Sequence, residues 1–212
     1  MNRAPFLGIF ITLEGIEGSG KSTQAAKLRD HLAAKGFDVV VTREPGGSPI
    51  AEKIRRILLD PSNTRMVPLA ELFLYEASRT QHVAEVIGPA LEAGKWVICD
   101  RFFDASTAYQ GNARGIDVAT VERLNLLATG GIKPDLTIVL DLEADVGLKR
   151  LGRSPDRLEA ESLAFHRRVR EGYLKIAASD SSRIKIVDAS GSIDDISIRI
   201  REIVEAWLAS RR

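Results

Sequence analysis

The stretch Gly15-Ile16-Glu17-Gly18-Ser19-Gly20-Lys21-Ser22 decides the fold class of this sequence. It fits every fixed position of an eight-residue phosphate-binding loop, in which glycines let backbone N–H groups converge on phosphate oxygens. An apolar run precedes it and a helix-forming segment follows it, as such a loop requires. We expect Lys21 to reach the outer phosphates of a nucleoside triphosphate and Ser22 to hold a magnesium ion, with Thr23 as a second hydroxyl beside it. The pattern alone does not separate a kinase from a hydrolysing switch.

Apolar runs alternate with helix-forming segments along the whole chain. The predicted strands are Gly8–Glu14, Phe37–Thr42, Trp96–Cys99, Leu136–Asp141 and Ile184–Val187. The predicted helices are Lys21–Lys35, Ser48–Leu59, Leu69–Ala93, Val118–Thr129, Asp145–Arg150, Arg157–Ala178 and a last helix capped by Ser192. Five strands separated by helices predict an α/β fold with a five-stranded, mostly parallel sheet and helices on both faces. Ligands of such sheets bind beyond the carboxyl ends of the strands, so the functional residues are expected there.

The composition is that of an ordinary globular protein, and 212 residues fit one domain. The formal net charge of +1 gives no support to a nucleic-acid-binding or membrane-surface role. Cys99 is the only cysteine, so no internal disulfide can form and a reducing compartment is expected. The apolar run Phe6–Leu13 is too short to span a membrane and lacks a small-residue cleavage site. We therefore expect a cytoplasmic protein without nucleic-acid or membrane partners.

A second charged pair, Asp100-Arg101, follows the predicted strand Trp96–Cys99. An acid at this strand end is well placed to hold magnesium or its waters, although a helix-capping aspartate has the same pattern. Arg101 beside it indicates a second phosphate, one that belongs to an acceptor. A nucleotide-hydrolysing switch would usually carry Asp-x-x-Gly here, whereas this chain continues with Phe102-Phe103. This strand end therefore favours phosphate transfer over a switch.

Two further groups of residues fit an acceptor site, but each also has a simpler explanation. The segment Thr42–Gly47 places Arg43 near two adjacent glycines that permit close approach of a ligand phosphate. A surface turn with a solvated arginine explains that segment equally well. Tyr75 and Arg79 share a helix face, on which a base can stack while the arginine donates to a ring carbonyl. Taken alone, a core tyrosine beside a surface arginine is the simpler interpretation.

Arginines also cluster around a short polar segment in the second half of the chain. Arg150, Arg153 and Arg157 bracket the stretch Gly152–Asp156. Basic residues on a short mobile segment suit a lid that closes over transferring phosphates. A solvated basic helix end is the alternative.

Five segments occur together and in a characteristic order: Gly15–Thr23, Thr42–Gly47, Asp100–Phe102, Ala108–Gly111 and Arg150–Glu159. Together they resemble the thymidylate kinase family, and the resemblance runs from the first strand to about Tyr173. It implies a P-loop nucleoside-monophosphate-kinase fold, a single domain over 1–212 with a monophosphate-binding region at about 43–111 and a short lid at about 150–158. It also implies the reaction ATP + dTMP → ADP + dTDP with Mg²⁺, and a homodimer with helices such as Leu69–Ala93 at its interface.

The resemblance assigns catalytic and ATP-binding roles residue by residue. The implied ATP-binding positions are Gly15–Thr23, Arg150 and Arg157, and the implied catalytic positions are Lys21, Glu17, Arg101 and Arg153. Glu17 stands where the family places an acid near the acceptor sugar and the transferring phosphate. An acid in the loop together with lid arginines resembles the bacterial members of the family. Arg153 is then the candidate transition-state arginine, assisted by the other two lid arginines, while Ser22 and Asp100 are the metal positions.

The same resemblance assigns the dTMP-binding positions. Arg43 and Arg101 match ligands of the acceptor phosphate, and Arg79 matches the residue that hydrogen-bonds a thymine carbonyl. Tyr109 lies where the family tests for the missing 2′-hydroxyl. The full implied set is Glu17, Arg43, Tyr75, Arg79, Arg101, Ser106, Thr107, Tyr109 and Gln110, of which Ser106, Thr107 and Gln110 lie near the base edge. The chain departs from many relatives at Tyr75, where they stack the base on phenylalanine.

Two rival functions remain open on the sequence. Another monophosphate kinase or a deoxynucleoside kinase would share the fold, but Thr42–Gly47 and Ala108–Gly111 argue against it. A nucleotide-dependent switch or regulator would be non-enzymatic, but the residues after Asp100 and the arginine-rich lid oppose it.

Overall fold

The computed structural model of the chain describes residues 7–152 and 154–211. Its sheet confirms the predicted strand number and direction, because all four strand pairings are parallel. The strands are β1 (Ile9–Glu14), β2 (Val39–Arg43), β3 (Trp96–Asp100), β4 (Leu136–Asp141) and β5 (Ile184–Asp188). Their order across the sheet is β2-β3-β1-β4-β5, which puts β1 in the centre. The carboxyl ends of β1, β2 and β3 therefore open onto one edge of the molecule.

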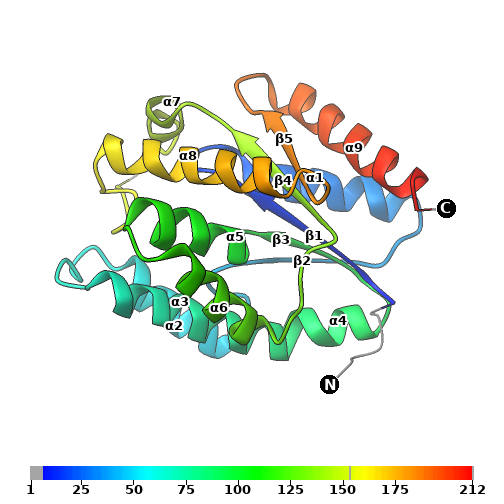
Figure 1. Cartoon of the computed structure of the whole chain (residues 1–212). Coiled ribbons are helices and arrows are strands. Elements are labelled where there is room, and N and C mark those ends of the chain that lie inside the picture. Colours follow the sequence, from blue (N-terminus) through cyan, green and yellow to red (C-terminus); the bar gives the residue numbers. More distant parts are fainter. Residues whose placement is uncertain (1–6, 153, 212) are drawn as a thin grey trace.

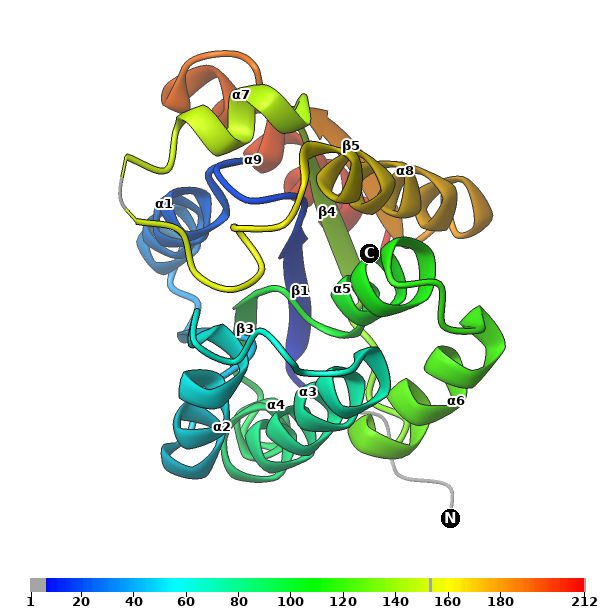
Figure 2. The same ribbon diagram turned by 90° about the vertical axis from the view of Figure 1, so that its left-hand side faces the viewer.

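Helices cover both faces of this sheet, as predicted (Figures 1 and 2). The α-helices are α1 (Lys21–Ala34), α2 (Pro49–Leu59), α3 (Pro68–His82), α4 (Gly88–Glu92), α5 (Phe103–Ser106), α6 (Val118–Thr129), α7 (Ala144–Lys149), α8 (Leu163–Ser179) and α9 (Ile193–Ala209). Two π-helical segments, η1 (Val83–Ile87) and η2 (Thr107–Ala113), continue α3 and α5. Helices α1 and α9 pack together on one face, while α8 packs against η2 on the other. No helix in the described part of the chain is long and apolar enough to cross a membrane.

The apolar core lies on both sides of the central strands. Ile11 and Leu13 of β1 pack in one cluster, and Phe10, which precedes Ile11 in sequence, packs in the other. Neighbouring strand β3 divides in the same way, with Ile98 in the first cluster and Val97 in the second. Successive strand residues point to opposite faces, so a run that is apolar throughout predicts a strand buried on both faces. This burial makes the ends of β1 and β3 firm supports for the loops that follow them.

The structure differs from the predicted elements at two places. The helix predicted over Arg157–Ala178 begins only at Leu163, because Ser162 caps it by accepting a hydrogen bond from the Phe165 backbone N–H at 3.2 Å. The segment α5–η2 was not predicted as helix, since its polar residues break the apolar spacing. Those polar residues are buried nonetheless, with Gln110 bonded to Glu71 of α3 at 2.8 Å. This helix is therefore stabilised by buried polar contacts, and a prediction from apolar spacing could not detect it.

Candidate active site

The phosphate loop joins β1 to α1 and is closed by its own backbone. Ser19 Oγ donates to the Ile16 carbonyl at 2.9 Å, and Lys21 Nζ donates to the same carbonyl at 2.8 Å. Gly18 has φ +69°, and a Cβ there would lie 2.0 Å from the Gly147 carbonyl oxygen of α7. Only glycine therefore fits where the loop touches α7. The N-terminus of α1 opens at the loop, as anion binding requires.

Lys21 is buried in the free protein, with 7% of its surface exposed. Burial and the nearby Arg101 charge lower the pKa of its ammonium to about 8, although neighbouring acids oppose this. A phosphate bound in the loop would add negative charge beside Lys21 and would favour its ammonium form.

Ser22 and Asp100 meet where α1 begins and β3 ends. Ser22 Oγ donates to Asp100 Oδ2 at 2.5 Å. A hydroxyl and a carboxylate oxygen are ligands that magnesium prefers, and Mg²⁺ uses few protein ligands beside water and substrate phosphates. No group of three or more His, Cys, Asp or Glu residues that could hold a metal occurs among residues 7–152 and 154–211. The pair fits magnesium carried with a nucleotide and does not fit an all-protein metal cage.

Arg101 has an unusual backbone that several groups hold in place. Its φ of +71° makes it the single non-glycine residue with positive φ in the described chain. Nη1 donates to the Gly15 carbonyl at 2.8 Å, and Nη2 donates to Glu17 Oε1 at 3.0 Å. The guanidinium also lies 5.0 Å from the centre of the Tyr109 ring. The side chain is thereby held across the phosphate loop.

The Glu17 carboxylate contacts three side chains, those of Arg101, Tyr109 and His166. Its Oε1 also accepts from the Tyr109 hydroxyl at 2.5 Å, and its Oε2 lies 3.2 Å from Nδ1 of the buried His166. Burial would raise the pKa of this carboxyl, but Arg101 and His166 outweigh burial and hold the pKa well below its usual range. Glu17 is therefore a charged acceptor at neutral pH. This role of His166 could not be predicted from the sequence, because the residue lies on a distant helix, α8.

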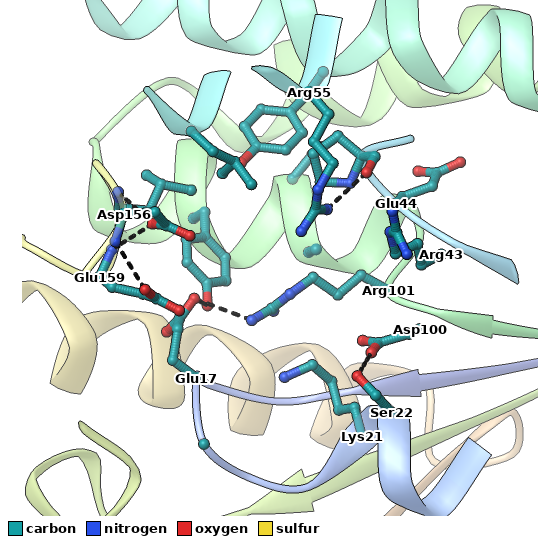
Figure 3. Close-up of a pocket in the computed structure, with 18 of the residues that line it drawn as sticks. Glu17, Lys21, Ser22, Arg43, Glu44, Arg55, Asp100, Arg101, Asp156 and Glu159 are labelled. Carbon is teal, nitrogen blue, oxygen red and sulfur yellow. Dashed lines mark hydrogen bonds and ion pairs between the residues drawn. The ribbon is translucent and has the colours of Figure 1, made fainter. Parts of the chain in front are cut away.

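The cavity beside these residues has a volume of about 260 Å³ and lies at the carboxyl edge of the sheet. Figure 3 shows Arg101 and Lys21 projecting into it, with their nitrogen atoms turned toward Glu17. Most of the predicted site residues line it: Glu17, Gly18, Lys21, Ser22, Arg43, Tyr75, Asp100, Arg101, Ser106, Tyr109 and Gln110. The structure thus brings together residues that are spread over almost one hundred positions of the sequence.

Arg79 is not among these lining residues, and its predicted contact with a ring carbonyl stays a prediction. The side chain is only 1% exposed. All five of its N–H groups already point at protein acceptors, which are Glu44, Glu76, Asn125, Ser106 and the Phe102 carbonyl. A ring carbonyl could gain an N–H of Arg79 only by displacing one of them. Arg79 instead supports Ser106, which does line the cavity.

Other predicted residues also point elsewhere. Thr107 faces away from the cavity and accepts from Asn125 Nδ2 at 3.2 Å. Arg150 Nη1 donates to the Ala189 carbonyl at 3.1 Å, and Arg157 Nη1 donates to Glu71 Oε2 at 2.6 Å. The structure thus does not bring Arg150 or Arg157 to the phosphate loop. Arg153 lies outside the described residues.

Several lining residues were not predicted from the sequence, among them Arg55, Asp156 and Glu159. Arg55 of α2 donates to the Pro45 carbonyl at 2.8 Å and projects into the cavity (Figure 3). Asp156 and Glu159 form a reciprocal cap, in which Asp156 N–H donates to Glu159 Oε2 and Glu159 N–H donates to Asp156 Oδ1. This Asp-x-x-Glu spacing is a capping-box signal that could have predicted the turn. Burial raises the pKa of Asp156.

The sheet order, the phosphate loop and a cavity shared by two facing cations define a P-loop nucleoside monophosphate kinase. The thymidylate kinase family model matches residues 13–200. The chain is 54% identical over 202 residues to the thymidylate kinase of Syntrophotalea carbinolica, covering 92% of this chain and 94% of the relative. It is 52% identical over 207 residues to that of Geotalea daltonii, with 93% and 97% covered. The crystal structure of thymidylate kinase from Ehrlichia chaffeensis superposes with a TM-score of 0.76 at 32% identity, covering 93% of this chain and 98% of that one. The chain belongs to the thymidylate kinase family.

Proposed function

We propose that the cavity transfers the γ-phosphate of ATP to the phosphate of dTMP, giving ADP and dTDP for dTTP synthesis. Membership of the thymidylate kinase family makes the chain a phosphotransferase. One observation carries the proposal. Lys21 of the phosphate loop and Arg101 of the β3 end line the same cavity, so two phosphate groups can meet there. The bonded pair Ser22–Asp100 lines it beside them.

The ATP half of the site consists of the loop Gly15–Thr23 and the start of α1. Lys21 and the loop amides bind the outer phosphates, while Ser22 and Asp100 hold Mg²⁺. Magnesium supplies positive charge to the phosphate oxygens during transfer. The segment at about 150–158 acts as the lid, and Arg153 reaches the transferred phosphate, assisted by Arg150 and Arg157. Because Arg157 is bonded to Glu71 in this structure, its part requires the lid to rearrange.

The acceptor half spans the monophosphate-binding region, about 43–111. Arg43 and Arg101 bind the dTMP phosphate, and Tyr75 stacks on the thymine ring. Ser106 and Gln110 meet the base edge. The Tyr109 hydroxyl is bonded to Glu17 in the free protein, which supports the two acting together near the sugar, where a 2′-hydroxyl would be tested.

The transfer needs alignment and charge neutralisation more than proton chemistry. An oxygen of the dTMP phosphate attacks the γ-phosphorus in line, the bond to the β–γ bridging oxygen breaks, and ADP leaves with that electron pair. The attacking phosphate is ionised at neutral pH, so no general base is required. Lys21, Arg101 and Arg153 share the developing charge with the metal ion, and a closed lid excludes water.

We also propose that the chain forms a homodimer in the cytoplasm. Leu69 and Phe73 of α3 are 48% and 52% exposed, and Leu126 and Leu127 of α6 are 56% and 78% exposed. Helices α3 and α6 pack against each other, so these side chains lie on adjoining helices. Exposed apolar side chains gathered on packed helices favour burial against a second copy. Sedimentation analysis should give twice the chain mass for the wild type and a lower mass for Phe73→Glu.

The function is tested by ADP production with dTMP, dUMP, dCMP and AMP side by side. We expect dTMP to have the highest kcat/KM. The preference over dUMP should be modest, because one methyl group is worth about 1–3 kcal/mol in a fitted pocket. Equal efficiency for dTMP and dUMP would remove the fitted methyl pocket. Absence of ADP with every monophosphate would revive the switch or regulator, and a different preferred acceptor would favour another nucleotide kinase.

A further inference from the structure

Glu14, the last residue of β1, is a fully buried acid that does not line the cavity. Its Oε1 accepts from the Phe102 backbone N–H at 2.7 Å, and its Oε2 accepts from the Tyr173 hydroxyl at 2.7 Å. Burial and the nearby Asp104 raise the pKa of this carboxyl to about 8, against the opposing charge of Arg101. Burying a carboxyl group away from water costs free energy. We therefore ask what the two hydrogen bonds of Glu14 do for the site.

Tyr173 of α8 connects Glu14 to the cavity. Its ring is 1% exposed, and its oxygen accepts from Arg101 Nη1 at 3.1 Å. Arginine is only a donor, so the single hydroxyl proton of Tyr173 is left for Glu14. Arg101 therefore donates to Tyr173, and Tyr173 in turn is hydrogen-bonded to Glu14.

The same part of β1 holds the backbone around Arg101. The Arg101 N–H donates to the Leu13 carbonyl at 3.0 Å, and the next N–H, from Phe102, donates to Glu14. Arg101 has the left-handed φ of +71° described above, which a non-glycine residue keeps only when its surroundings enforce it. Glu14 therefore supports Arg101 in two ways. It accepts a hydrogen bond from the peptide that follows Arg101, and it is linked through Tyr173 to the Arg101 guanidinium.

We propose that Glu14 and Tyr173 are positioning residues that aim the Arg101 guanidinium at the acceptor phosphate. This inference rests on the proposed function, because Arg101 is the acceptor-phosphate ligand in it. Neither residue lines the cavity, so we assign their effect on the acceptor phosphate to Arg101. Without the Tyr173 hydroxyl, the Arg101 guanidinium keeps its hydrogen bonds to Gly15 and Glu17 but loses the one to Tyr173.

The test is a double-mutant cycle between Tyr173→Phe and Arg101→Ala. Tyr173→Phe keeps the ring and its edge contact with Tyr109, and it removes only the hydroxyl. We expect Tyr173→Phe to lower kcat/KM for dTMP about tenfold in the wild-type background and less than twofold in Arg101→Ala. KM for ATP should stay within about twofold, because Arg101 does not belong to the ATP half. Glu14→Gln should reproduce the loss in part, since an amide oxygen still accepts one of the two hydrogen bonds.

A matched control is Thr12→Val, which removes a different buried hydroxyl, one on β1, from a 2.7 Å contact with Thr137. Thr12→Val should lower the free energy of unfolding without changing the ratio of KM for dTMP to KM for ATP. The inference is overturned by an equal effect of Tyr173→Phe with and without Arg101, or by an active wild type that Tyr173→Phe leaves unchanged. An inactive wild type instead overturns the proposed function, and this inference with it.

Discussion

Ser22 Oγ lies 2.5 Å from Asp100 Oδ2, which ties the first turn of α1 to the end of β3. The contact places a hydroxyl and a carboxylate at the border between the proposed ATP and acceptor halves. It is the part of the site where the metal ion would bind, and its removal should be visible in the metal dependence of turnover.

Asp100→Asn should lower kcat on the order of 10²-fold and raise the Mg²⁺ concentration needed for half-maximal rate, because an amide has no charge to offer the cation. A magnesium titration of ADP production measures both. Asp38→Asn, which changes an exposed acid paired with Lys95, is the control. An unchanged magnesium requirement in Asp100→Asn would exclude Asp100 from metal binding.

Binding of ATP should take up a proton at alkaline pH. The pKa of Lys21 is lowered to about 8 in the free protein, so at pH 8.5 about three quarters of the lysine is neutral. Bound phosphates favour the ammonium form and raise this pKa, so binding must be accompanied by protonation. Calorimetry in buffers of different ionisation enthalpy measures the uptake. Lys21→Arg, which stays charged throughout, should show none, and equal uptake by both proteins would contradict the assignment to Lys21.

Arg79→Met should destabilise the fold by about 3–5 kcal/mol, because it leaves the buried Glu44 and Glu76 carboxylates without their cation. Urea unfolding followed by circular dichroism measures the change. The exposed Arg123 of α6 offers a matched control, and Arg123→Met should stay within about 0.5 kcal/mol of the wild type. A loss below about 1 kcal/mol in Arg79→Met would show that the ion cluster does not support the fold.

Arg153→Ala should cost about 3–4 kcal/mol in the transition state, by analogy with the loss of one oxyanion donor. Turnover with saturating ATP and dTMP is the measurement. Arg150→Ala should cost less, because Arg150 already donates to the Ala189 carbonyl. If Arg153→Ala keeps a rate within about threefold of the wild type, the transition-state arginine is another residue.

The sheet and the phosphate loop could be predicted because their signals are local. A strand such as β1 is one continuous apolar run, and the loop after it is one fixed pattern. Arg79 shows the limit of such reasoning. Its spacing from Tyr75 correctly put both on one helix, but only the fold reveals that Glu44 reaches it from the loop after β2. Partners that come from distant elements leave no trace in the spacing of a single segment.

The end of the proposed lid segment shows a different limit. Arg157 is predicted to open a helix and to face ATP, whereas its side chain is buried against α2 and α3 through Leu58 and Glu71. The charge of Arg157 did not indicate that its partner would be the buried Glu71 rather than a phosphate. The capping pair Asp156–Glu159 was readable in the sequence, and it correctly marks a turn before α8.

The contact between Gly18 and Gly147 also has a mechanical consequence. A Cβ on Gly18 would lie 2.0 Å from the Gly147 carbonyl oxygen, and a Cβ on Gly147 would lie 2.3 Å from the Glu17 carbonyl oxygen. The backbones at Gly18 and Gly147 are therefore in direct contact. No flexible side chain lies between them that could absorb a displacement. Helix α7 leads directly into the segment proposed as the lid. Any tilt of α7 would therefore press on the peptide of Glu17, which couples the position of that helix to the shape of the phosphate loop.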